Sequence, residues 1–212
     1  MNLNFDSVLH FLHGAAAGSL TTQSRQMPGY PFASVMPFVL DEGHRPVFLI
    51  SGLAEHTKNL AADCRACLLI HGPDVNAERA SVLGDVQRID AAEQLRARYI
   101  RYHPDAEQYL ALGDFAFYRL MPKGARYIAG FGHMGWIGEA DWAASASLPA
   151  ADEASLAREL IGAPPAGVRF LGADCYGFDI ERGGRRERQR FSDGPIAAHD
   201  IGTAVRRILP VI

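Results

Sequence analysis

The chain has 212 residues, of which 48% are hydrophobic and 21% charged, a balance that is ordinary for a soluble globular protein. Its 21 basic and 24 acidic residues give a net charge of −3, so it lacks the positive field that attracts nucleic acids or anionic membranes. No apolar run approaches the roughly 20 residues of a membrane helix, and the N-terminus has no basic start followed by a long apolar segment. We therefore expect a cytoplasmic protein with no nucleic-acid or membrane partner.

The first half of the chain predicts a helix followed by five strands. Asp6 can cap a helix that runs to about Ala17 and places its apolar side chains on one face. Strands are predicted at residues 19–23, 32–40, 46–51, 65–71 and 80–89, and the turn signals between them indicate an antiparallel meander. A short helix at residues 53–63 interrupts this meander at one end of the sheet.

The three cysteines, Cys64, Cys67 and Cys175, are an odd number without the spacing of a disulfide scaffold. The Cys64-Arg-Ala-Cys67 spacing suits zinc or redox chemistry, but zinc requires two more ligands and only Cys175 and scattered histidines remain. We prefer the interpretation that Cys67 is a small apolar residue in a buried strand. No metal site is predicted.

The second half predicts helices, a hairpin and a small separate unit. Asp90 and Glu93 have the spacing of a capping box, which would open a helix to residue 102, and a short helix is expected at residues 104–112. Strands at 115–121 and 126–131 form a predicted hairpin around Pro122-Lys-Gly-Ala125. The small-residue tract at 141–151 is interpreted as a linker between a domain at 1–140 and another at 152–212.

The C-terminal domain is predicted to be α+β. It would contain helices at residues 152–161 and 199–209, and strands at 168–173, 177–182 and 185–191. Gly183-Gly184 supplies the tight turn between the last two strands, because glycine adopts the positive φ angles that such a turn requires.

A plausible phosphate cradle lies where the strand at 46–51 leads into the short helix at 53–63. The N–H groups and partial positive charge of a helix start can bind a phosphate. If the strands at 32–40 and 46–51 pair, their Ser34 and Ser51 hydroxyls lie beside that helix start. Thr57, Lys58 and Asn59 would add a hydroxyl, a cation and an amide. The alternative is an ordinary helix start with a solvated lysine.

The segment from Gly18 to Leu69 contains the motifs G-x-L-T-T, P-G-x-P-x-A-S and I-S-x-L-A-x-H-T-x-N. Together with Tyr102-His-Pro, Gly113-Asp-Phe-Ala-Phe-Tyr and Gly130-Phe-Gly-His-Met, it resembles the pyridoxamine 5′-phosphate oxidase-like FMN-binding split-barrel family, and looks closest to its haem-utilisation subgroup. The resemblance implies an α+β fold with a six-stranded antiparallel split β-barrel and flanking helices, to which a small α+β C-terminal extension is attached.

The resemblance also implies a homodimer that binds FMN at the subunit interface and acts as a flavin-dependent oxidoreductase on an unknown small-molecule substrate. The residues that would hold the FMN phosphate and ribityl chain are Ser34, Ser51, His56, Thr57, Lys58 and Asn59. Those that would approach the flavin ring are Phe131, Gly132 and His133. Because the flavin supplies the redox chemistry, no catalytic side chain is assigned.

The C-terminal region departs from the oxidases proper, whose Arg-Leu-His type motif for substrate phosphate is missing. It resembles instead the small domain appended to haem-utilisation members. Five arginines cluster here, and we prefer a solvated, ion-paired strand to an anion or haem-propionate site. These arginines are Arg182, Arg185, Arg186, Arg188 and Arg190.

The alternative function is haem binding without flavin, for haem utilisation or degradation. His133 and His199 are then the candidate axial ligands, because His133 follows a Phe-Gly turn and His199 lies near the C-terminus. His10 and His13 are three residues apart in the first predicted helix. Since no carboxylate has a matching spacing, we prefer packing to metal binding for this pair.

Overall fold

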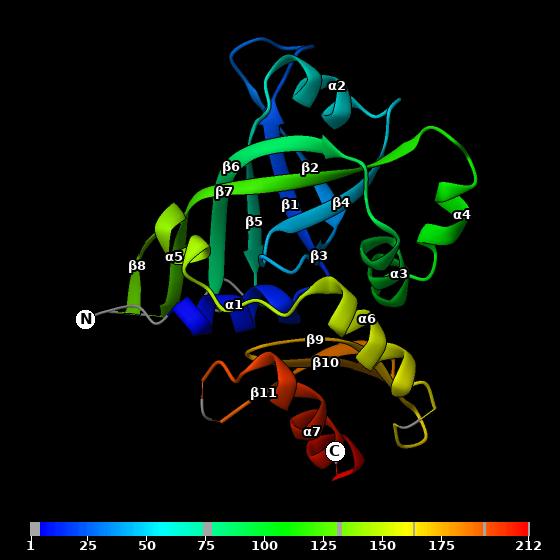
Figure 1. Ribbon diagram of the computed structural model, residues 1–212. Helices are drawn as coiled ribbons and strands as arrows, with labels where there is room; N and C mark the ends of the chain where they lie inside the picture. The colour runs from blue at the N-terminus through cyan, green and yellow to red at the C-terminus, as the bar shows by residue number, and fades with distance from the viewer. Residues whose placement is uncertain (1–4, 74–77, 131–132, 163, 193, 212) are drawn as a thin grey trace.

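The computed structural model describes residues 5–73, 78–130, 133–162, 164–192 and 194–211. An eight-stranded antiparallel sheet curves into an open barrel, and a three-stranded sheet lies below it in Figure 1. The predicted α+β class, with a mostly antiparallel split barrel and flanking helices, is confirmed. No helix in the described ranges is long and apolar enough to span a membrane.

The elements up to the end of the barrel sheet follow one another along the chain with short connections. They are α1 (Phe5–Gly14), β1 (Ala17–Gln23), β2 (Pro31–Pro37), β3 (Val39–Leu40), β4 (Pro46–Ser51), α2 (Glu55–Ala62), β5 (Arg65–His71), β6 (Arg79–Ile89), α3 (Glu93–Tyr102), α4 (Ala106–Leu110), β7 (Phe115–Gly130) and β8 (His133–Gly138). The remaining elements are α5 (Glu139–Ala143), α6 (Ala150–Glu159), β9 (Val168–Asp174), β10 (Gly177–Arg182), β11 (Arg185–Arg190), α7 (Ala198–Ile208) and the 3₁₀ turn η1 (Leu209–Val211).

The barrel sheet has the strand order β2-β1-β5-β6-β7-β4-β3, and β8 pairs with the second half of β7. Residues that pair across neighbouring strands point to the same face, so the register shows which side chains enter the core. Leu20, Leu68 and Val82 are opposite one another in three successive strands, and all three are fully buried. The alternation of apolar and polar residues along each strand therefore accounts for the filled interior.

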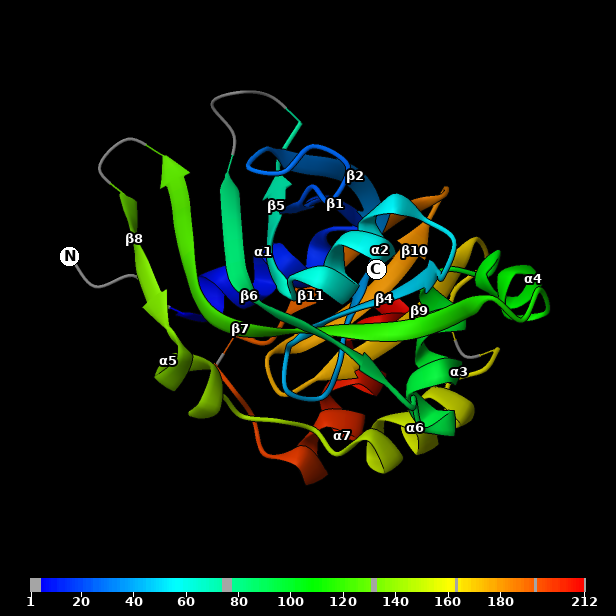
Figure 2. The same ribbon diagram turned by 90° about the horizontal axis from the view of Figure 1, so that it is seen from above.

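The predicted hairpin around Pro122 is wrong, because β7 continues through it as one strand from Phe115 to Gly130. Figure 2 shows β7 as one long curved ribbon. At this point the register against β6 shifts: Leu83 faces Gly124 and Gly84 faces Pro122, so Lys123 is an extra residue on β7. A bulge of this kind tolerates proline and bends the strand, which is why a sequence typical of a turn occurs inside a strand.

Two predicted helix ends also differ from the structure. α3 begins at Glu93 with Ala92 at its N-cap and no side-chain capping bond, so the capping box predicted from Asp90 does not form. α1 ends at Gly14 instead of continuing to Ala17, because Ala17 is already the first residue of β1 and residues 15 and 16 connect the two elements.

The three-stranded sheet has the order β11-β10-β9, and its β10–β11 hairpin is the one that the glycine turn predicts. Gly183 and Gly184 have φ angles of 56° and 74°, the positive values expected for this turn. Phe178, Ile180, Ile201 and Val205 are buried between this sheet and α7. The C-terminal unit thus has its own hydrophobic core.

Helix α1 lies between the barrel and the C-terminal sheet (Figure 1). Val8 and Leu12 pack into the barrel core, whereas Leu9 packs into the core of the C-terminal unit. The segment predicted as a linker contains the end of α5 and the start of α6, and its Ala146 accepts and donates hydrogen bonds at 2.9 and 3.0 Å. The proposed domain boundaries at 140 and 152 stay a prediction.

The preferred interpretation of the arginine cluster, a solvated strand, is wrong for Arg186 and Arg188. The Arg188 side chain is 5% exposed and pairs with Asp174 at 2.7 Å and Asp179 at 3.2 Å. Arg186 donates to the carbonyl oxygen of Ala15, and its guanidinium lies 4.6 Å from the centre of the Tyr102 ring. The sequence could not show that α1 covers this face of β11.

Candidate cofactor site

The predicted phosphate cradle lies at the start of α2, which contacts β1 and β2 and covers one end of the barrel (Figure 1). Its N-cap residue is Ala54, which makes no side-chain capping bond, so the first N–H groups of the helix remain available to an anion. Glu55 places a carboxylate in the same first turn and would oppose a phosphate there.

Ser34 and His56 are brought together by the packing of α2 on β2. Their Oγ and Nδ1 atoms lie 3.2 Å apart. The Nε2 atom of His56 is covered by protein and has no hydrogen-bond partner in the described structure. Burial lowers the pKa of His56, so the ring is neutral at pH 7 and does not add a positive charge to the cradle.

The Ser51 and Thr57 hydroxyls already have partners within the chain. Ser51 donates to a carboxylate oxygen of Asp114 at 2.5 Å and accepts from the N–H of Leu53 at 3.0 Å. Thr57 donates to the carbonyl oxygen of Ser51 at 2.6 Å. These bonds shape the loop before α2, and the Asp114 carboxylate would repel a phosphate at Ser51. Their assignment as phosphate ligands stays a prediction.

Asn59 is fully buried, and its amide joins α2 to the first hairpin of the barrel. Its Oδ1 accepts the backbone N–H of Arg25 at 2.9 Å, and its Nδ2 donates to the Thr22 hydroxyl at 3.1 Å. The amide therefore positions the loop that carries Arg25. Lys58, by contrast, is exposed on the outer side of α2.

Replacing Asn59 with alanine is expected to lower the free energy of unfolding by about 2 kcal/mol, because the buried Thr22 hydroxyl and the partly buried N–H of Arg25 each lose a hydrogen-bond partner. The measurement is urea unfolding followed by circular dichroism. Lys58→Ala is the matched control on the same helix, and is expected to change stability by less than about 0.5 kcal/mol. Equal losses in both variants would contradict a structural role for the Asn59 amide.

Of the residues predicted to approach a flavin ring, Phe131 and Gly132 lie outside the described residues. His133 is exposed at the first residue of β8, and the strand β8 is separated from α2 in both views. It could meet a ring at α2 only across a subunit boundary, and that placement stays a prediction. His199 is at the start of α7, where its side chain is 82% exposed.

The outer face of the barrel sheet carries a register row of mixed apolar and polar residues with two exposed large apolar side chains, which the sequence did not predict. The register places residues of six successive strands side by side on this face. The row reads Val35, Ser19, Leu69, Ser81, Arg126 and Trp136. Val35 is 77% and Trp136 67% exposed, so large apolar side chains face outward here.

His71 is exposed beside this row, at the end of β5. The next register row runs from His71 through Arg79 and Ile128 to Met134. The Nδ1 of His71 lies 2.7 Å from the carbonyl oxygen of Gly72. Because a carbonyl oxygen only accepts, Nδ1 carries the proton and Nε2 keeps a lone pair that can bind a metal centre.

A second group that the sequence did not predict is buried between the barrel and the C-terminal sheet. His13, His44 and Asp174 converge there from three distant parts of the chain. The histidine pair at positions 10 and 13 was the available sequence signal, but the structure separates the two rings: His13 enters this group, whereas His10 lies against Arg188. The partners His44 and Asp174 have no common spacing that could identify them.

An open antiparallel barrel of this order, with a helix across one end and flanking helices, defines the split-barrel class. The chain belongs to the CREG beta-barrel family, whose model matches residues 10–144. The predicted relation to the pyridoxamine 5′-phosphate oxidase-like split barrels is thereby confirmed at the level of the fold.

A curated relative is the non-canonical heme oxygenase HOZ of Arabidopsis thaliana, a chloroplastic protein. It is 36% identical over 123 residues, which are 56% of this chain and 38% of that protein. The chain therefore spans less than half the length of the relative.

Two solved structures resemble nearly the whole chain. One is a protein of unknown function from Agrobacterium tumefaciens, with a TM-score of 0.76 and 23% sequence identity; the superposition covers 96% of this chain and 94% of that protein. The other is a heme binding protein from Mycobacterium smegmatis, with a TM-score of 0.62 and 23% sequence identity; the superposition covers 99% of this chain and 97% of that protein. These likenesses extend the shared fold to the C-terminal unit.

Proposed function

We propose that this protein binds haem between two copies of the chain and that the bound haem is degraded oxidatively. The observation that carries the proposal is the identity with the Arabidopsis heme oxygenase. It is 36% over an alignment of 123 residues, and this alignment covers 56% of the chain. The alternative FMN cradle is less well supported, because the Ser51, Thr57 and Asn59 side chains are used within the chain.

The outer face of the barrel sheet has the chemistry that a haem requires. His71 offers an exposed imidazole whose tautomer leaves Nε2 free, and we assign it as the first candidate for the axial ligand, before His133. Met134 and Trp136 supply exposed apolar surface for the flat ring, and the Arg126 guanidinium, 6.0 Å from the centre of the Trp136 ring, can pair with a propionate.

The bound iron would supply the oxygen chemistry, and the chain would supply the ligand, a partly dry surface and charge pairing.

A second copy of the chain is the proposed cover for this face. A single sheet that exposes Val35, Leu83 and Trp136 on one side leaves apolar area that association would remove from water. The predicted homodimer therefore accounts both for the exposed row and for the enclosure of a haem. Sedimentation of the purified protein gives the oligomeric state directly.

The test is a titration of the purified protein with haemin, followed by removal of unbound haem and recording of the Soret band. We expect retained haem, and we expect His71→Ala to weaken its binding by about tenfold or more, since the iron loses its ligand. His199→Ala tests the other predicted ligand, an exposed histidine at the start of α7, and is expected to keep its haem. If His71→Ala keeps a normal Soret band and His133→Ala loses it, the axial ligand is His133 and not His71.

FMN remains the second candidate, favoured by the uncapped start of α2 and the exposed Lys58 beside it. The same titration with FMN tests it, and Lys58→Ala is expected to weaken FMN binding without affecting haem. Flavin uptake with no haem uptake would replace the haem proposal. Uptake of neither would exclude both functions.

A further inference from the structure

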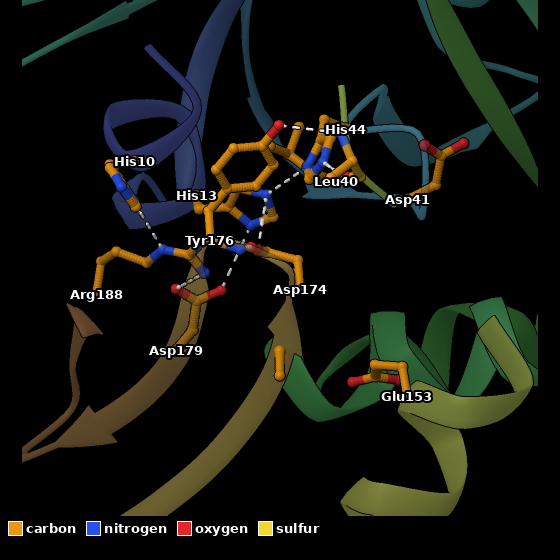
Figure 3. A network of polar contacts seen from close by, with 12 residues as sticks. His10, His13, Leu40, Asp41, His44, Glu153, Asp174, Tyr176, Asp179 and Arg188 are labelled. Atoms are coloured by element: carbon orange, nitrogen blue, oxygen red, sulfur yellow. Dashed lines mark hydrogen bonds and ion pairs between the residues drawn. The ribbon is translucent and has the colours of Figure 1, made fainter. Parts of the chain in front are cut away.

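His13, His44 and Asp174 form a buried group under α1, where the barrel meets the C-terminal sheet (Figure 3). His13 comes from α1, His44 from the turn between β3 and β4, and Asp174 from the end of β9. The three residues are 3%, 0% and 5% exposed. The Nε2 of His13 lies 3.0 Å from the Nδ1 of His44 and 3.2 Å from the Oδ2 of Asp174.

The surrounding contacts fix which atom each side chain presents to the centre of the group. The Nε2 of His44 lies 2.9 Å from the carbonyl oxygen of Ala146 and must carry a proton to donate to it, which leaves Nδ1 as the ring atom that faces His13. The Oδ1 of Asp174 accepts the N–H of Tyr176 and an Nη2 proton of Arg188, both at 2.7 Å. The remaining oxygen, Oδ2, is directed at His13.

One atom of the group has no hydrogen-bond partner. The buried Oδ2 of Asp174 makes no correctly aligned hydrogen bond in the described structure, although it lies 3.2 Å from the Nε2 of His13. A buried carboxylate oxygen of this kind usually has a donor or a bound ion as its partner. Three potential ligand atoms therefore converge at one buried point, and one of them lacks a partner within the chain.

We propose that the Nε2 of His13, the Nδ1 of His44 and the Oδ2 of Asp174 bind a divalent first-row transition-metal ion, for which Zn²⁺ is the best chemical match. Two imidazoles and a carboxylate are a typical zinc ligand set. Tetrahedral zinc with bonds of about 2.0–2.1 Å places its ligand atoms about 3.3 Å apart. The two separations from His13, 3.0 and 3.2 Å, are close to that value, and all three ligand atoms lie within 4.8 Å of one another.

The second layer of contacts supports the same assignment. Metal-binding histidines usually donate their other nitrogen to a carbonyl or carboxylate, which fixes the ring. His44 does so with Ala146, and the Nδ1 of His13 lies 3.5 Å from the Oδ2 of Asp179. Figure 3 shows Asp179 beside the group, on another element than His13, His44 and Asp174. The metal would therefore join α1, the barrel and the C-terminal sheet at one point.

The first experiment measures the metal content of the full-length protein after exposure to Zn²⁺ and desalting, and records the visible spectrum after loading with Co²⁺. We expect about one ion per chain and the absorption of four-coordinate Co²⁺ without a thiolate charge-transfer band. In His13→Gln and His44→Asn, zinc affinity is expected to fall by more than about 100-fold, beyond the range for loss of an outer partner. Asparagine is chosen at position 44 because His44 has a φ of 56°.

Two control variants separate this site from other ligands in the chain. His10→Gln removes the neighbouring histidine of α1, and the double change Cys64→Ser with Cys67→Ser removes the cysteine pair; both are expected to keep the zinc. Zinc lost from the cysteine variant but kept by His13→Gln would overturn the proposal. So would a folded wild-type protein that takes up neither zinc nor cobalt.

If the histidine variants do not fold, zinc X-ray absorption of the wild-type protein decides. Nitrogen and oxygen scatterers with an imidazole pattern are expected, whereas sulfur in the first shell would contradict the site. None of these measurements depends on haem binding. They therefore test the metal site independently of the proposed function.

Discussion

Replacing Arg188 with alanine is expected to lower the free energy of unfolding by about 3–5 kcal/mol, the range for removing one partner of a buried ion pair. The guanidinium lies between Asp174 at 2.7 Å and Asp179 at 3.2 Å, and these carboxylate side chains are only 7% and 0% exposed. Burial alone would raise the pKa of Asp179, but the Arg188 charge and the contact with His13 together outweigh burial and lower that pKa to about 2. Without Arg188 two buried negative charges lose their main compensation.

Urea unfolding measures this effect, with Arg185→Ala as the matched control from the exposed side of the same strand. The control is expected to change stability by less than about 0.5 kcal/mol. Arg188→Lys should fall between the two, because lysine keeps the charge but cannot reach both carboxylates with one planar fork. A loss in Arg188→Ala no larger than in the control would show that the network does not stabilise the fold.

The strands that could be predicted from the sequence are those whose pattern is local. β4 and β5 occupy the predicted residues 46–51 and 65–71, because alternating or continuous apolar residues between turn signals determine both their length and their buried face. The glycine turn of β10 and β11 was predictable for the same reason, since two consecutive glycines suit positive φ angles.

The burial of the arginine strand and of His13 could not be predicted, because it depends on where α1 packs. An arginine-rich strand beside glutamates is typical of a solvated edge. Only the fold shows that Arg188 points under α1 towards Asp174 and Asp179, and that His13 meets His44 in the same region. Sequence spacing carries no information about contacts between such distant segments.

The start of α2 and the exposed Lys58 follow from the strand-loop-helix pattern of the sequence, whereas their use as a cofactor site stays a prediction. Ser34 lies beside His56 for another reason than the one predicted, because β2 pairs with β1 and not with β4. The engagement of Ser51 by Asp114 depends on β4 pairing with β7, which the sequence does not specify. A hydroxyl that seems available for a ligand in the sequence motif can therefore already be hydrogen-bonded to a neighbouring strand or loop.

Replacing Gly84 with alanine is expected to destabilise the barrel by about 3 kcal/mol, at the upper end of the usual cost of overpacking. A Cβ at this position would lie 2.0 Å from the carbonyl oxygen of Met121 and 2.8 Å from its carbonyl carbon. Both atoms belong to the backbone of β7, so no side-chain rotation can relieve the contact. The strands β6 and β7 would have to separate at the bulge, where Lys123 is the extra residue.

Gly14→Ala is the matched control, since a Cβ there has its nearest neighbour at 3.9 Å. Thermal unfolding followed by circular dichroism compares the two variants with the wild-type protein. A small effect at Gly84 would mean that β6 and β7 do not approach this closely, and that residues 122–125 form the turn that the sequence suggests. A large loss of thermal stability in Gly84→Ala, with little change in Gly14→Ala, is the expected result. It would mean that the close approach of β6 and β7 at Gly84 lets the proline-containing segment continue as a strand and curve the barrel.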